Sequence, residues 1–403
     1  MTTLFSFDTP LMSSAIEAAV PANFIAAMLV AGHADHPFVM SKLAAGVGSP
    51  SVEVSWMEWT RRLGVYTPSS AQTSSDTVIV IDTTSGLRVG DVLLNENGGV
   101  ADTGLELLLV SAIGSSPAQI TVTRGFSGTT PQDLAVARPL KLVGSAAIEG
   151  ADHSDTLSKA FKLRQNYTQI QKEDFTISNS NLVSAYHGGE SPLQVMLRGA
   201  YSTLIEKVSR TLVQGGANAS GLAGDGSTAR HCDGIIEMCR TGSAAGDGGI
   251  FTNASGADFG TAATAWDNFN DYLKAVAELG GKPSAVLASG RVASQLSRDG
   301  ALSIVQGADG VAYRNVAFIK SVFGDLPIYS ELTAVPDSAC VFVNEAEVKW
   351  HWLGMGADMR SIKLQEIGPT GDARKFQLIC EGAVSARGAY SGNGFSTLFG
   401  LGA

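Results

Sequence analysis

Residues 191–214, SPLQVMLRGAYSTLIEKVSRTLVQ, carry the clearest structural signal in this chain of 403 residues. Apolar side chains recur there in steps of three and four residues, as they do on one face of a helix: Leu193, Leu197, Tyr201, Leu204, Val208 and Leu212. Ser191 and Gln194 form a capping box around Pro192, and Gly215 follows the last turn. The segment therefore predicts one helix, roughly 36 Å long at about 1.5 Å per residue.

The two faces of this helix differ in chemistry. Arg198, Ser202, Glu206 and Arg210 lie roughly opposite the apolar residues, and Glu206 precedes Arg210 by the four residues that favour an ion pair. We expect the apolar face to pack on a sheet of a sizeable domain and the polar face to look to solvent or to the inside of an assembly.

The composition limits the classes of partner. Charged residues make up 16% of the chain, below the roughly 25% that is usual for soluble domains, so we expect apolar surface to be buried between subunits. The formal net charge is −10, and no Lys/Arg cluster interrupts the acidic average. Such a chain lacks the electrostatic footprint of a sequence-independent DNA-binding protein.

The sequence predicts neither a membrane span nor a secretory signal. The apolar run at 22–31 is shorter than the roughly 20 residues that a span requires, and the first basic residue is Lys42. Four scattered cysteines are typical of reduced thiols in a cytosolic product: Cys232, Cys239, Cys340 and Cys380.

Residues 72–144 differ from the rest of the chain in their pattern of short β-rich runs. Five short β-rich runs follow one another between Gly, Ser, Asn and Pro turns: TVIVI, LRVGDVLLN, LELLLVS, AQITVTRGF and RPLKLV. They predict a small all-β domain, either a barrel or a sandwich. The flanking segments 51–66 and 159–178 are predicted to be extended, so we expect this domain to be inserted at the tip of a two-stranded excursion.

Elsewhere helices and strands are interleaved irregularly. Residues 264–279 predict a second amphipathic helix, 284–289 a buried strand, and SIKLQEIGPTGDARKFQLICEGAV a C-terminal hairpin. Residues 1–50 contain only short helical patches and are predicted to form an arm that lies on something else. Without regular βαβ alternation the predicted class is α+β.

No motif in the sequence predicts catalysis or a cofactor. Gly224, Gly226 and Ala229 match a loose dinucleotide fingerprint, but they follow a Gly-rich loop rather than a strand, so a flexible loop is the better interpretation. The sequence contains no nucleophile elbow, HExxH, Walker loop or EF-hand loop. We therefore expect no enzyme activity and no cofactor.

The histidines, cysteines and tryptophans fit other roles better than ligand binding. His231, Cys232 and Cys239 lack the second ligand pair that a tetrahedral zinc site needs, so a structural role is favoured and no metal is predicted. His33 and His36 lie in a turn bounded by Gly and Pro and are expected to face solvent. The indoles of Trp56 and Trp59 could stack on bases or sugars, but packing or a subunit contact suits an acidic, charge-poor chain better.

Several stretches carry a resemblance to a known family: VSWMEWTRRL (54–63), NYTQIQKEDFTIS (166–178), the 191–214 helix, SVFGDLPIY (321–329) and IGPTGDARKFQLICEGAV (367–384). Their order is an arm, a long strand, a returning strand, a spine helix, a mixed domain and a late hairpin. In this order the chain, from about residue 50 to its end, resembles tailed-phage major capsid proteins with the HK97-type fold, and among them the SU10-like group.

The resemblance implies a division of the chain into an N-terminal arm, an E-loop with an inserted β-domain, a peripheral domain and an axial domain. The corresponding residues are 1–50 for the arm, 51–71 and 145–180 for the E-loop limbs, 72–144 for the inserted domain, 181–216 and 346–403 for the peripheral domain, and 217–345 for the axial domain.

The function implied by the resemblance is structural. It is self-assembly as hexamers and pentamers into an icosahedral head around double-stranded DNA, in the virion, after synthesis in the bacterial cytoplasm. The implied partners are copies of the chain itself and portal, scaffolding or decoration proteins, with only non-specific contact to DNA and none to a membrane. Inter-subunit contacts are expected at Trp56, Trp59, Arg61, Arg62, Tyr167 and Phe175.

Three other functions remain open at this point. One is a cellular compartment shell of the same fold, and another is a phage decoration protein or adhesin that acts through the β-domain. The third is an enzyme with an unrecognised site, which would show turnover or a bound metal. Electron microscopy separates the first two, because a container forms closed shells and an adhesin forms monomers or trimers.

Overall fold

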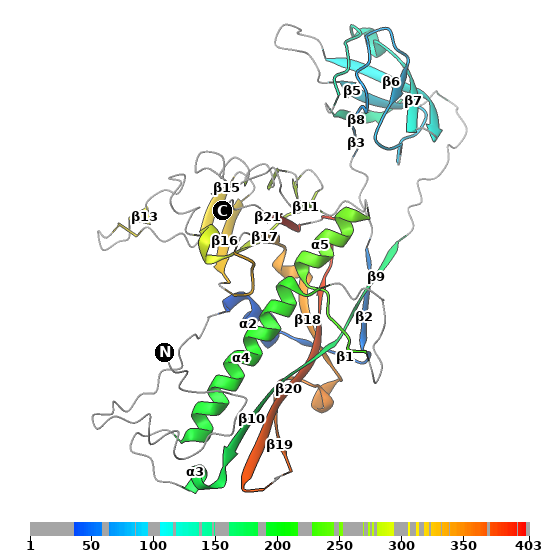
Figure 1. The fold of residues 1–403 in the computed structure, drawn as a ribbon. Coiled ribbons are helices and arrows are strands. Elements are labelled where there is room, and N and C mark those ends of the chain that lie inside the picture. The colour runs from blue at the N-terminus through cyan, green and yellow to red at the C-terminus, as the bar shows by residue number, and fades with distance from the viewer. Residues whose placement is uncertain are drawn as a thin grey trace. The chain divides into compact units, whose positions relative to one another are not determined.

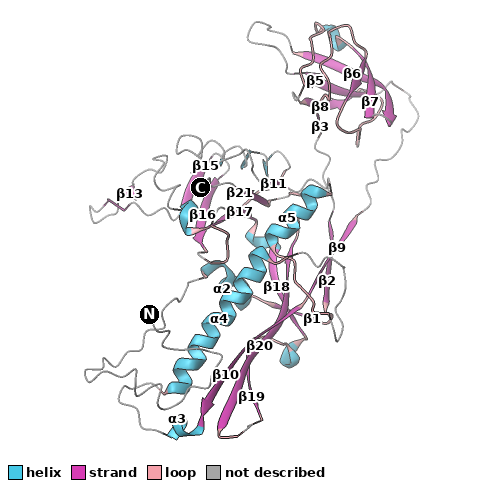
Figure 2. Ribbon diagram, viewed as in Figure 1, coloured by secondary structure: helices cyan, strands magenta, loops and turns pink. Residues whose placement is uncertain are grey.

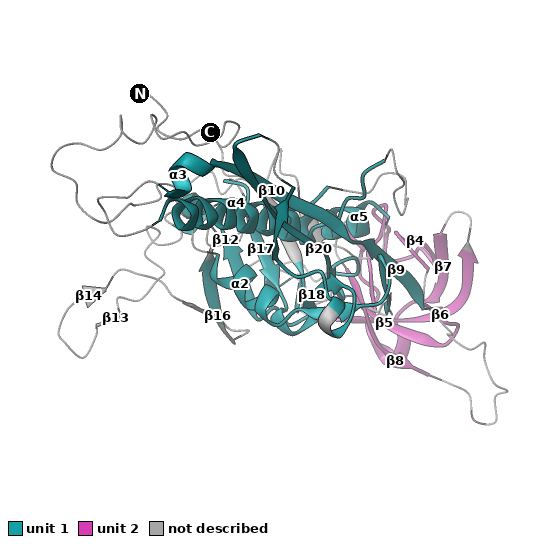
Figure 3. Cartoon of the chain, turned by 90° about the horizontal axis from the view of Figure 1, so that it is seen from below, with its two compact units in different colours: residues 1–60, 161–403 teal, residues 61–160 magenta. Residues whose placement is uncertain are grey.

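The computed structural model describes residues 36–403 except 59–63, 85, 96–104, 116–117, 137–138, 147–148, 150–160, 184–190, 217–227, 246–249, 253–268, 270–272, 275, 278–279, 294–304, 307–311, 314–317, 322–323, 332, 338, 369–370, 393 and 400–403. The chain divides into two compact units, unit 1 (residues 1–60 and 161–403) and unit 2 (residues 61–160), which Figure 3 colours separately. Figure 2 shows helices and strands together in unit 1. The predicted α+β class is confirmed.

The predicted long helix is confirmed as α4 (Pro192–Gln214). The Ser191 hydroxyl accepts a hydrogen bond from the backbone N–H of Gln194 at 3.4 Å, and Gly215 caps the other end. Figure 1 shows α4 lying along two long paired strands, β10 (Gln169–Ser178) and β20 (Ala373–Ala386). The helix thus packs on a sheet, as its two-faced pattern predicts.

The buried face of α4 differs from the predicted one in the first half of the helix. In the second half, the predicted side chains are fully buried, namely Leu204, Val208 and Leu212. Tyr201 is instead 40% exposed, while Gly199 and Ala200 are buried. A hydrophobic pattern ranks tyrosine above glycine and alanine, but the small residues let the helix backbone approach its neighbours closely.

The sheet under α4 has the strand order β1–β18–β20–β10, with β19 on the same edge of β20 as β18. Its remaining strands are β1 (Val47–Ser49), β18 (Val348–Leu353) and β19 (Lys363–Ile367). Strands β19 and β20 pair antiparallel and confirm the predicted C-terminal hairpin. On the face that packs against α4, Phe175 of β10 stacks on Phe376 of β20 with ring centroids 5.3 Å apart.

A second sheet of unit 1 has the order β11–β21–β17–β12–β16–β15. Its strands are β11 (Ile250–Thr252), β21 (Ser396–Phe399), β17 (Ala339–Val343), β12 (Ala285–Ala288), β16 (Gly324–Ser330) and β15 (Phe318–Ser321). Helix α5 (Ile235–Ala244) contacts β11 and β21, and β13 (Val305–Gln306) pairs with β14 (Ala312–Tyr313). All four residues of β12 are buried, which confirms the strand predicted at 284–289.

The predicted helix at 264–279 lies largely outside the described residues. Its described apolar positions, Phe269, Leu273 and Val276, are fully buried, and Phe269 and Leu273 share a cluster with Phe342 of β17. The ring centroids of Phe269 and Phe342 lie 4.9 Å apart. A short helix, α3 (Asn179–Val183), follows β10 directly.

Part of the predicted arm packs inside unit 1. Helix α2 (Pro37–Ala44) buries Phe38 in the main core, and β1 pairs with β18. His36, expected to face solvent, is only 3% exposed, and its Nδ1 atom lies 2.8 Å from Glu331 Oε2. The Phe38 N–H donates to the other carboxylate oxygen at 2.9 Å. The expectation for His36 was wrong because its partner lies 295 residues away in sequence; residues 1–35 lie outside the described part.

A second buried carboxylate, Glu381 of β20, joins distant loops to the same sheet. It accepts hydrogen bonds from the guanidinium groups of Arg230 and Arg360, and from the Thr168 hydroxyl at 3.0 Å. The Glu381 side chain is fully buried, so these donors replace the water that an ionised carboxylate would otherwise need.

The two predicted extended segments pair with each other. Strands β2 (Glu53–Glu58) and β9 (Lys162–Tyr167) form an antiparallel two-stranded ribbon, in which Met57 lies opposite Leu163. One residue separates β9 from β10, so the ribbon continues into the sheet under α4. This confirms the predicted two-stranded excursion.

Unit 2 is a closed six-stranded barrel in its described part. Its strand order is β3–β8–β5–β6–β7–β4, with β3 (Val65–Tyr66), β8 (Leu140–Ser145), β5 (Asp91–Asn95), β6 (Glu106–Ser115), β7 (Ala118–Thr123) and β4 (Val78–Val80). A bridge between Pro68 and Ile81 joins the two ends of this order and closes the barrel. Strand β3 lies within the segment predicted as a limb (51–71), yet it pairs with β8 because Tyr66 fills the barrel core.

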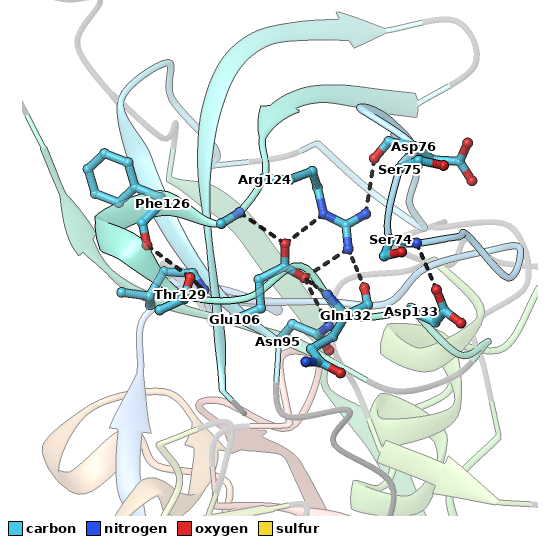
Figure 4. A network of polar contacts seen from close by, with 12 residues as sticks. Ser74, Ser75, Asp76, Asn95, Glu106, Arg124, Phe126, Thr129, Gln132 and Asp133 are labelled. Atoms are coloured by element: carbon cyan, nitrogen blue, oxygen red, sulfur yellow. Dashed lines mark hydrogen bonds and ion pairs between the residues drawn. The ribbon is translucent and has the colours of Figure 1, made fainter. Parts of the chain in front are cut away.

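An ion pair between Glu106 and Arg124 fastens one part of the barrel. Arg124 Nε and Nη2 donate to the two Glu106 oxygens at 2.7 and 2.8 Å, and Arg124 Nη1 donates to the Thr73 and Asp76 carbonyls at 2.9 and 3.0 Å. Figure 4 shows this network together with Gln132, whose N–H donates to Glu106 at 3.0 Å. Burial acts to raise the pKa of Glu106, but the hydrogen bonds from Arg124 and from the Gln132 and Gly125 N–H groups, together with the charge of Arg124, outweigh it, so the pKa is lowered.

We predict that Glu106→Gln lowers the free energy of unfolding of unit 2 by about 3 kcal/mol, because removing one partner leaves a buried guanidinium without its counter-charge. Hydrogen–deuterium exchange of β5, β6 and β7 peptides in the full-length protein measures the loss. Glu366→Gln at the exposed Glu366–Arg374 pair is the control and should leave exchange in these strands unchanged.

The same pair predicts a pH dependence. A carboxyl whose pKa is lowered by folding contributes its full stabilisation above its ordinary value, 4.5 for Glu106, and loses it as the pH falls through the lowered pKa. The protection of unit 2 amides, corrected for the pH dependence of exchange in an unfolded chain, should therefore fall below about pH 4.5 in the wild type and less so in Glu106→Gln. An identical pH dependence of the two proteins would contradict this account.

We also predict that Gly242→Ala destabilises unit 1 by about 2 kcal/mol, because overpacking a closed contact forces the backbone apart. A Cβ atom at Gly242 of α5 would lie only 2.0 Å from the Tyr390 carbonyl oxygen. Urea denaturation measures the change against Gly216→Ala, where nothing lies within 4 Å of the added Cβ. Equal midpoints for the two variants would show that this close approach is not needed.

Candidate assembly surfaces

Burial makes the cysteine thiols poor candidates for a reactive site. All four cysteines are buried thiols outside any disulfide, and burial raises the pKa of Cys232, Cys340 and Cys380 to about 12. Such thiols stay protonated near neutral pH and are poor nucleophiles. Cys232 is used in packing, since its Sγ accepts hydrogen bonds from Asn166 Nδ2 and the Val384 N–H, both at 3.4 Å.

Among the described residues, one pair that resembles a nucleophile and its base is Ser385 with His351. The Ser385 hydroxyl lies 2.8 Å from His351 Nε2, but Ser385 is only 5% exposed and cannot reach a substrate. Burial, then the cations of Lys349 and Arg387, lower the pKa of His351. A triad needs a carboxylate to orient its histidine, whereas the charges that act on this ring are positive. The pair serves to hold β18 against β20.

The described residues contain no group of three or more His, Cys, Asp or Glu side chains that could hold a metal ion. Within the same part of the chain, no helix is both long and apolar enough to cross a membrane.

Three of the six predicted contact residues lie outside the described residues, namely Trp59, Arg61 and Arg62. The other three are buried in unit 1, with exposed fractions of 9% for Trp56, 6% for Tyr167 and 1% for Phe175. Side chains that are almost fully covered by their own subunit have little surface left for a neighbour. These three side chains lie in the interior of unit 1, and their inter-subunit contact stays a prediction.

Trp56 belongs to a cluster that fixes the ribbon to unit 1. Its indole Nε1 donates to Glu58 Oε1 at 3.0 Å, and the same oxygen accepts the Gly388 N–H at 2.8 Å. Arg164 lies 3.7 Å from Glu58 Oε2 and 4.6 Å above the Tyr390 ring. The inward face of the ribbon is thereby tied to the loop that follows β20.

Asn166 fixes the other end of β9. Its Nδ2 donates to the carbonyls of Asp233 and Val384 at 3.0 and 2.7 Å, and its Oδ1 accepts the Asp233 N–H at 2.9 Å. The side chain is 1% exposed, so each polar atom needs a partner of this kind. One residue thus joins β9, β20 and the loop before α5.

One end of the outward face of the ribbon is apolar, whereas the next cross-strand pair on that face, Ser55 with Gln165, is polar and exposed. Met57 and Leu163 are a direct cross-strand pair with exposed fractions of 69% and 60%, and Phe161, two residues before Leu163, is 68% exposed. The sequence signal is present in β2, where every second residue is inward, so the apolar residue between two inward ones must face out. The tryptophans predicted as contacts are larger, but Trp56 lies on the inward face and Trp59 lies outside the described residues.

The family model described as SU10 major capsid protein matches residues 4–392 of the chain. No curated protein matches it. Among solved structures, it is similar to a chain of Mycobacterium phage Bobi (12% identity, TM-score 0.45, covering 98% of this chain and 100% of that one). It is also similar to a chain of the cyanophage A-1(L) capsid asymmetric unit (13%, 0.47, 94% and 97%) and to the virus-like particle from Pyrococcus furiosus (15%, 0.37, 59% and 79%).

The family match spans nearly the whole chain. The two-stranded limb, the long helix on a sheet and the late hairpin follow one another in the order that the sequence predicts. The chain therefore belongs to the SU10 major capsid protein family.

Proposed function

We propose that this chain assembles as hexamers and pentamers into an icosahedral bacteriophage head that encloses double-stranded DNA. Family membership makes the chain a major capsid protein, a structural component of the virion that assembles with copies of itself. The ring sizes, the closed icosahedral shell and the enclosed genome are the proposed part. The observation that carries the proposal is the exposed apolar face of the ribbon, formed by Met57, Phe161 and Leu163.

Leaving this apolar face in water is unfavourable in free energy. A fully buried side chain of this size contributes about 1.5 to 3 kcal/mol, and roughly two thirds of each side chain is exposed in the single chain. Covering the face with a neighbouring subunit would therefore contribute several kcal/mol before the cost of association. Each copy in a shell repeats the contact, so modest single interfaces suffice.

The ribbon is also held rigidly enough to present this face. Glu58, Arg164 and Asn166 fix its inward side through buried hydrogen bonds and a cation–π contact. Side chains on such a support lose little conformational entropy when a neighbour binds, which favours association. An apolar patch on a fixed strand pair is the feature that a repeated interface requires.

The overall charge suits a container. With a net charge of −10, the chain repels the phosphates of a genome rather than binding them, so we propose only non-specific contact with DNA. We also propose synthesis in the bacterial cytoplasm and contacts with portal, scaffolding or decoration proteins, which the family's structural role supports. The proposed parts of the subunit are the arm, E-loop limbs, inserted domain, peripheral domain and axial domain, with the bounds given by the resemblance.

Electron microscopy of the purified full-length protein tests the proposal. We expect closed shells whose class averages show five-fold and six-fold rings. Only monomers, or only small open oligomers, at concentrations where capsid proteins assemble would count against it. Shells that form during infection but contain no nuclease-protected double-stranded DNA would overturn the genome-enclosing part.

We predict that Leu163→Glu raises the protein concentration needed for assembly by at least about tenfold, the factor that corresponds to 1.4 kcal/mol. The substitution removes apolar area and places a charge where a neighbour is expected. Light scattering measures assembly, and circular dichroism should show an unchanged fold, because the side chain is 60% exposed. Val183→Glu, at an 86% exposed valine of α3, is the control for adding a charge elsewhere, and equal assembly of both variants would refute the contact.

A further inference from the structure

The sheet formed by β10, β20 and β19 has one face on α4 and one face turned away from it (Figure 1). Phe175 and Phe376 are buried on the α4 side, where Gln171 Nε2 also donates to the Thr211 hydroxyl of α4 at 2.7 Å. Direct partners on paired strands share a face and successive residues alternate, so the intervening positions point away from α4. These positions form rows across the three strands: Lys172, Ile379 and Lys363, then Asp174, Gln377 and Gln365, then Thr176, Lys375 and Ile367. We call these nine residues, with Ile170 and Glu381 in the row before them, the lysine face.

The lysine face is accessible to a partner. Ile170 is 48% exposed and Ile367 is 42% exposed, at opposite ends of the face. Lys172 and Lys363 are exposed as well, and Lys375 is half-buried. The solvated face of an antiparallel sheet is ordinarily polar, so exposed isoleucines at both ends are a departure. The face therefore offers a partner both charge and apolar area.

The lysine face is basic, although the chain as a whole carries a net charge of −10. Its three lysines share the rows with a single acid, Asp174, whose carboxylate accepts a hydrogen bond from Gln377 Nε2 at 2.7 Å. At one end of the face Arg230 and Arg360 both donate to Glu381, so two positive charges meet one negative charge. The face and its arginines thus carry five basic side chains against two acidic ones.

Two of the lysines have their charge available for a partner. In the described part of the chain, neither the Lys172 nor the Lys375 ammonium group forms an ion pair with a carboxylate. Glu173, the neighbour of Lys172 in β10, points to the other side of the sheet, where it pairs with Lys207 of α4. The positive charge of the face is therefore open to an acidic partner.

The apolar residues of the face decide between two classes of acidic partner. A DNA backbone presents charged phosphates and sugars, so it gives Ile170, Ile367 and Ile379 little apolar surface to pack on. A polypeptide that carries carboxylates beside apolar side chains matches both parts of the face. The face thus fits an acidic, apolar protein segment better than a nucleic acid.

We propose that residues 1–35 of this chain bind the lysine face, either in their own subunit or in a neighbouring copy. This segment contains three acids, Asp8, Glu17 and Asp35, and no basic residue precedes Lys42. Apolar residues stand close to the acids in the sequence: Phe5, Phe7, Leu11, Met12 and Ile16. Both the sign of the charge and the apolar content complement the face.

The other long stretches without a basic residue are engaged elsewhere. Residues 89–123 supply three strands of the barrel, and Asp91 and Glu106 within them are fully buried. Residues 241–273 supply β11 to the second sheet and bury Phe269 and Leu273 in a core cluster. Residues 1–35 are therefore the segment of this chain that suits the face best.

The place where the segment joins the subunit allows this contact. The segment ends at His36, just before α2, and α2 contacts β18 of the same sheet. At up to about 3.3 Å per residue, 35 residues span up to about 115 Å, several times the roughly 33 Å length of the ten-residue β10. The inference goes beyond the proposed shell assembly and does not depend on it, because one chain supplies both the segment and the face.

Zero-length carbodiimide coupling of the purified full-length protein, followed by peptide mass spectrometry, tests the proposal. The reagent joins a carboxylate to an amine only where the two are in contact. We expect Asp8 and Glu17 to couple to Lys172 and Lys375 at least tenfold more than to Lys207, the control lysine on the α4 side, whose side chain is 49% exposed. Equal coupling to the three lysines would overturn the inference.

A charge swap separates a specific contact from general attraction. Lys172→Glu and Glu17→Lys should each lower the coupling of Asp8 to Lys375 at least threefold, and the two together should restore it. Lys207→Glu combined with Glu17→Lys is the matched control and should leave the coupling low. Failure of the first combination to restore coupling, or equal restoration by both, would contradict the proposed contact.

Two further outcomes separate this inference from the functions already discussed. Protection of Lys172 and Lys375 from amine labelling by short double-stranded DNA, with no coupling to residues 1–35, would assign the face to nucleic acid and overturn the inference. Coupling in a protein that forms no closed shells would support the inference and count against the shell, and closed shells without coupling would do the reverse.

Discussion

The hydrogen bonding of β20 is the constraint on which the rest of unit 1 depends. This strand runs from Ala373 to Ala386, with β10 along one edge and β19 and then β18 along the other. A long strand with both edges paired leaves few backbone groups to be satisfied elsewhere, and its register fixes which side chains face α4. The limb, the spine helix and α2 are all attached to strands that this register places.

Buried carboxylates fasten loops to that frame and to the barrel. Glu331 holds the start of α2, Glu381 holds two arginine-bearing loops, and Glu106 holds the loops of unit 2. Each is fully buried, so each stabilises the structure only with all its donors in place, and an alternative loop position would leave a charge unpaired. In a chain with few charged residues, these ionic contacts specify loop geometry while the apolar core supplies the driving force.

The surfaces available for assembly consist of residues that the core does not bury. Large aromatic residues such as Trp56 and Phe175 are buried inside the subunit, where they stabilise its own fold. The exposed apolar residues Met57 and Leu163 are smaller and lie on the outward face of the ribbon. A residue's size therefore predicts poorly whether it contacts a neighbour, whereas its place in a strand's alternation predicts well which face it is on.

The sequence by itself determined the local elements and their order. The capping residues and periodicity of 191–214 predicted α4, the short β-rich runs predicted an all-β unit, and the stretches at 54–63 and 367–384 pointed to the family. These signals are local, and local physics generates them. Only the tertiary structure decided that His36 contacts Glu331, and that Gly199 and Ala200 are buried on α4 while Tyr201 is exposed. It also decided that β3 joins the barrel and that Trp56 faces inward, because such outcomes depend on partners far away in the sequence, which no local pattern records.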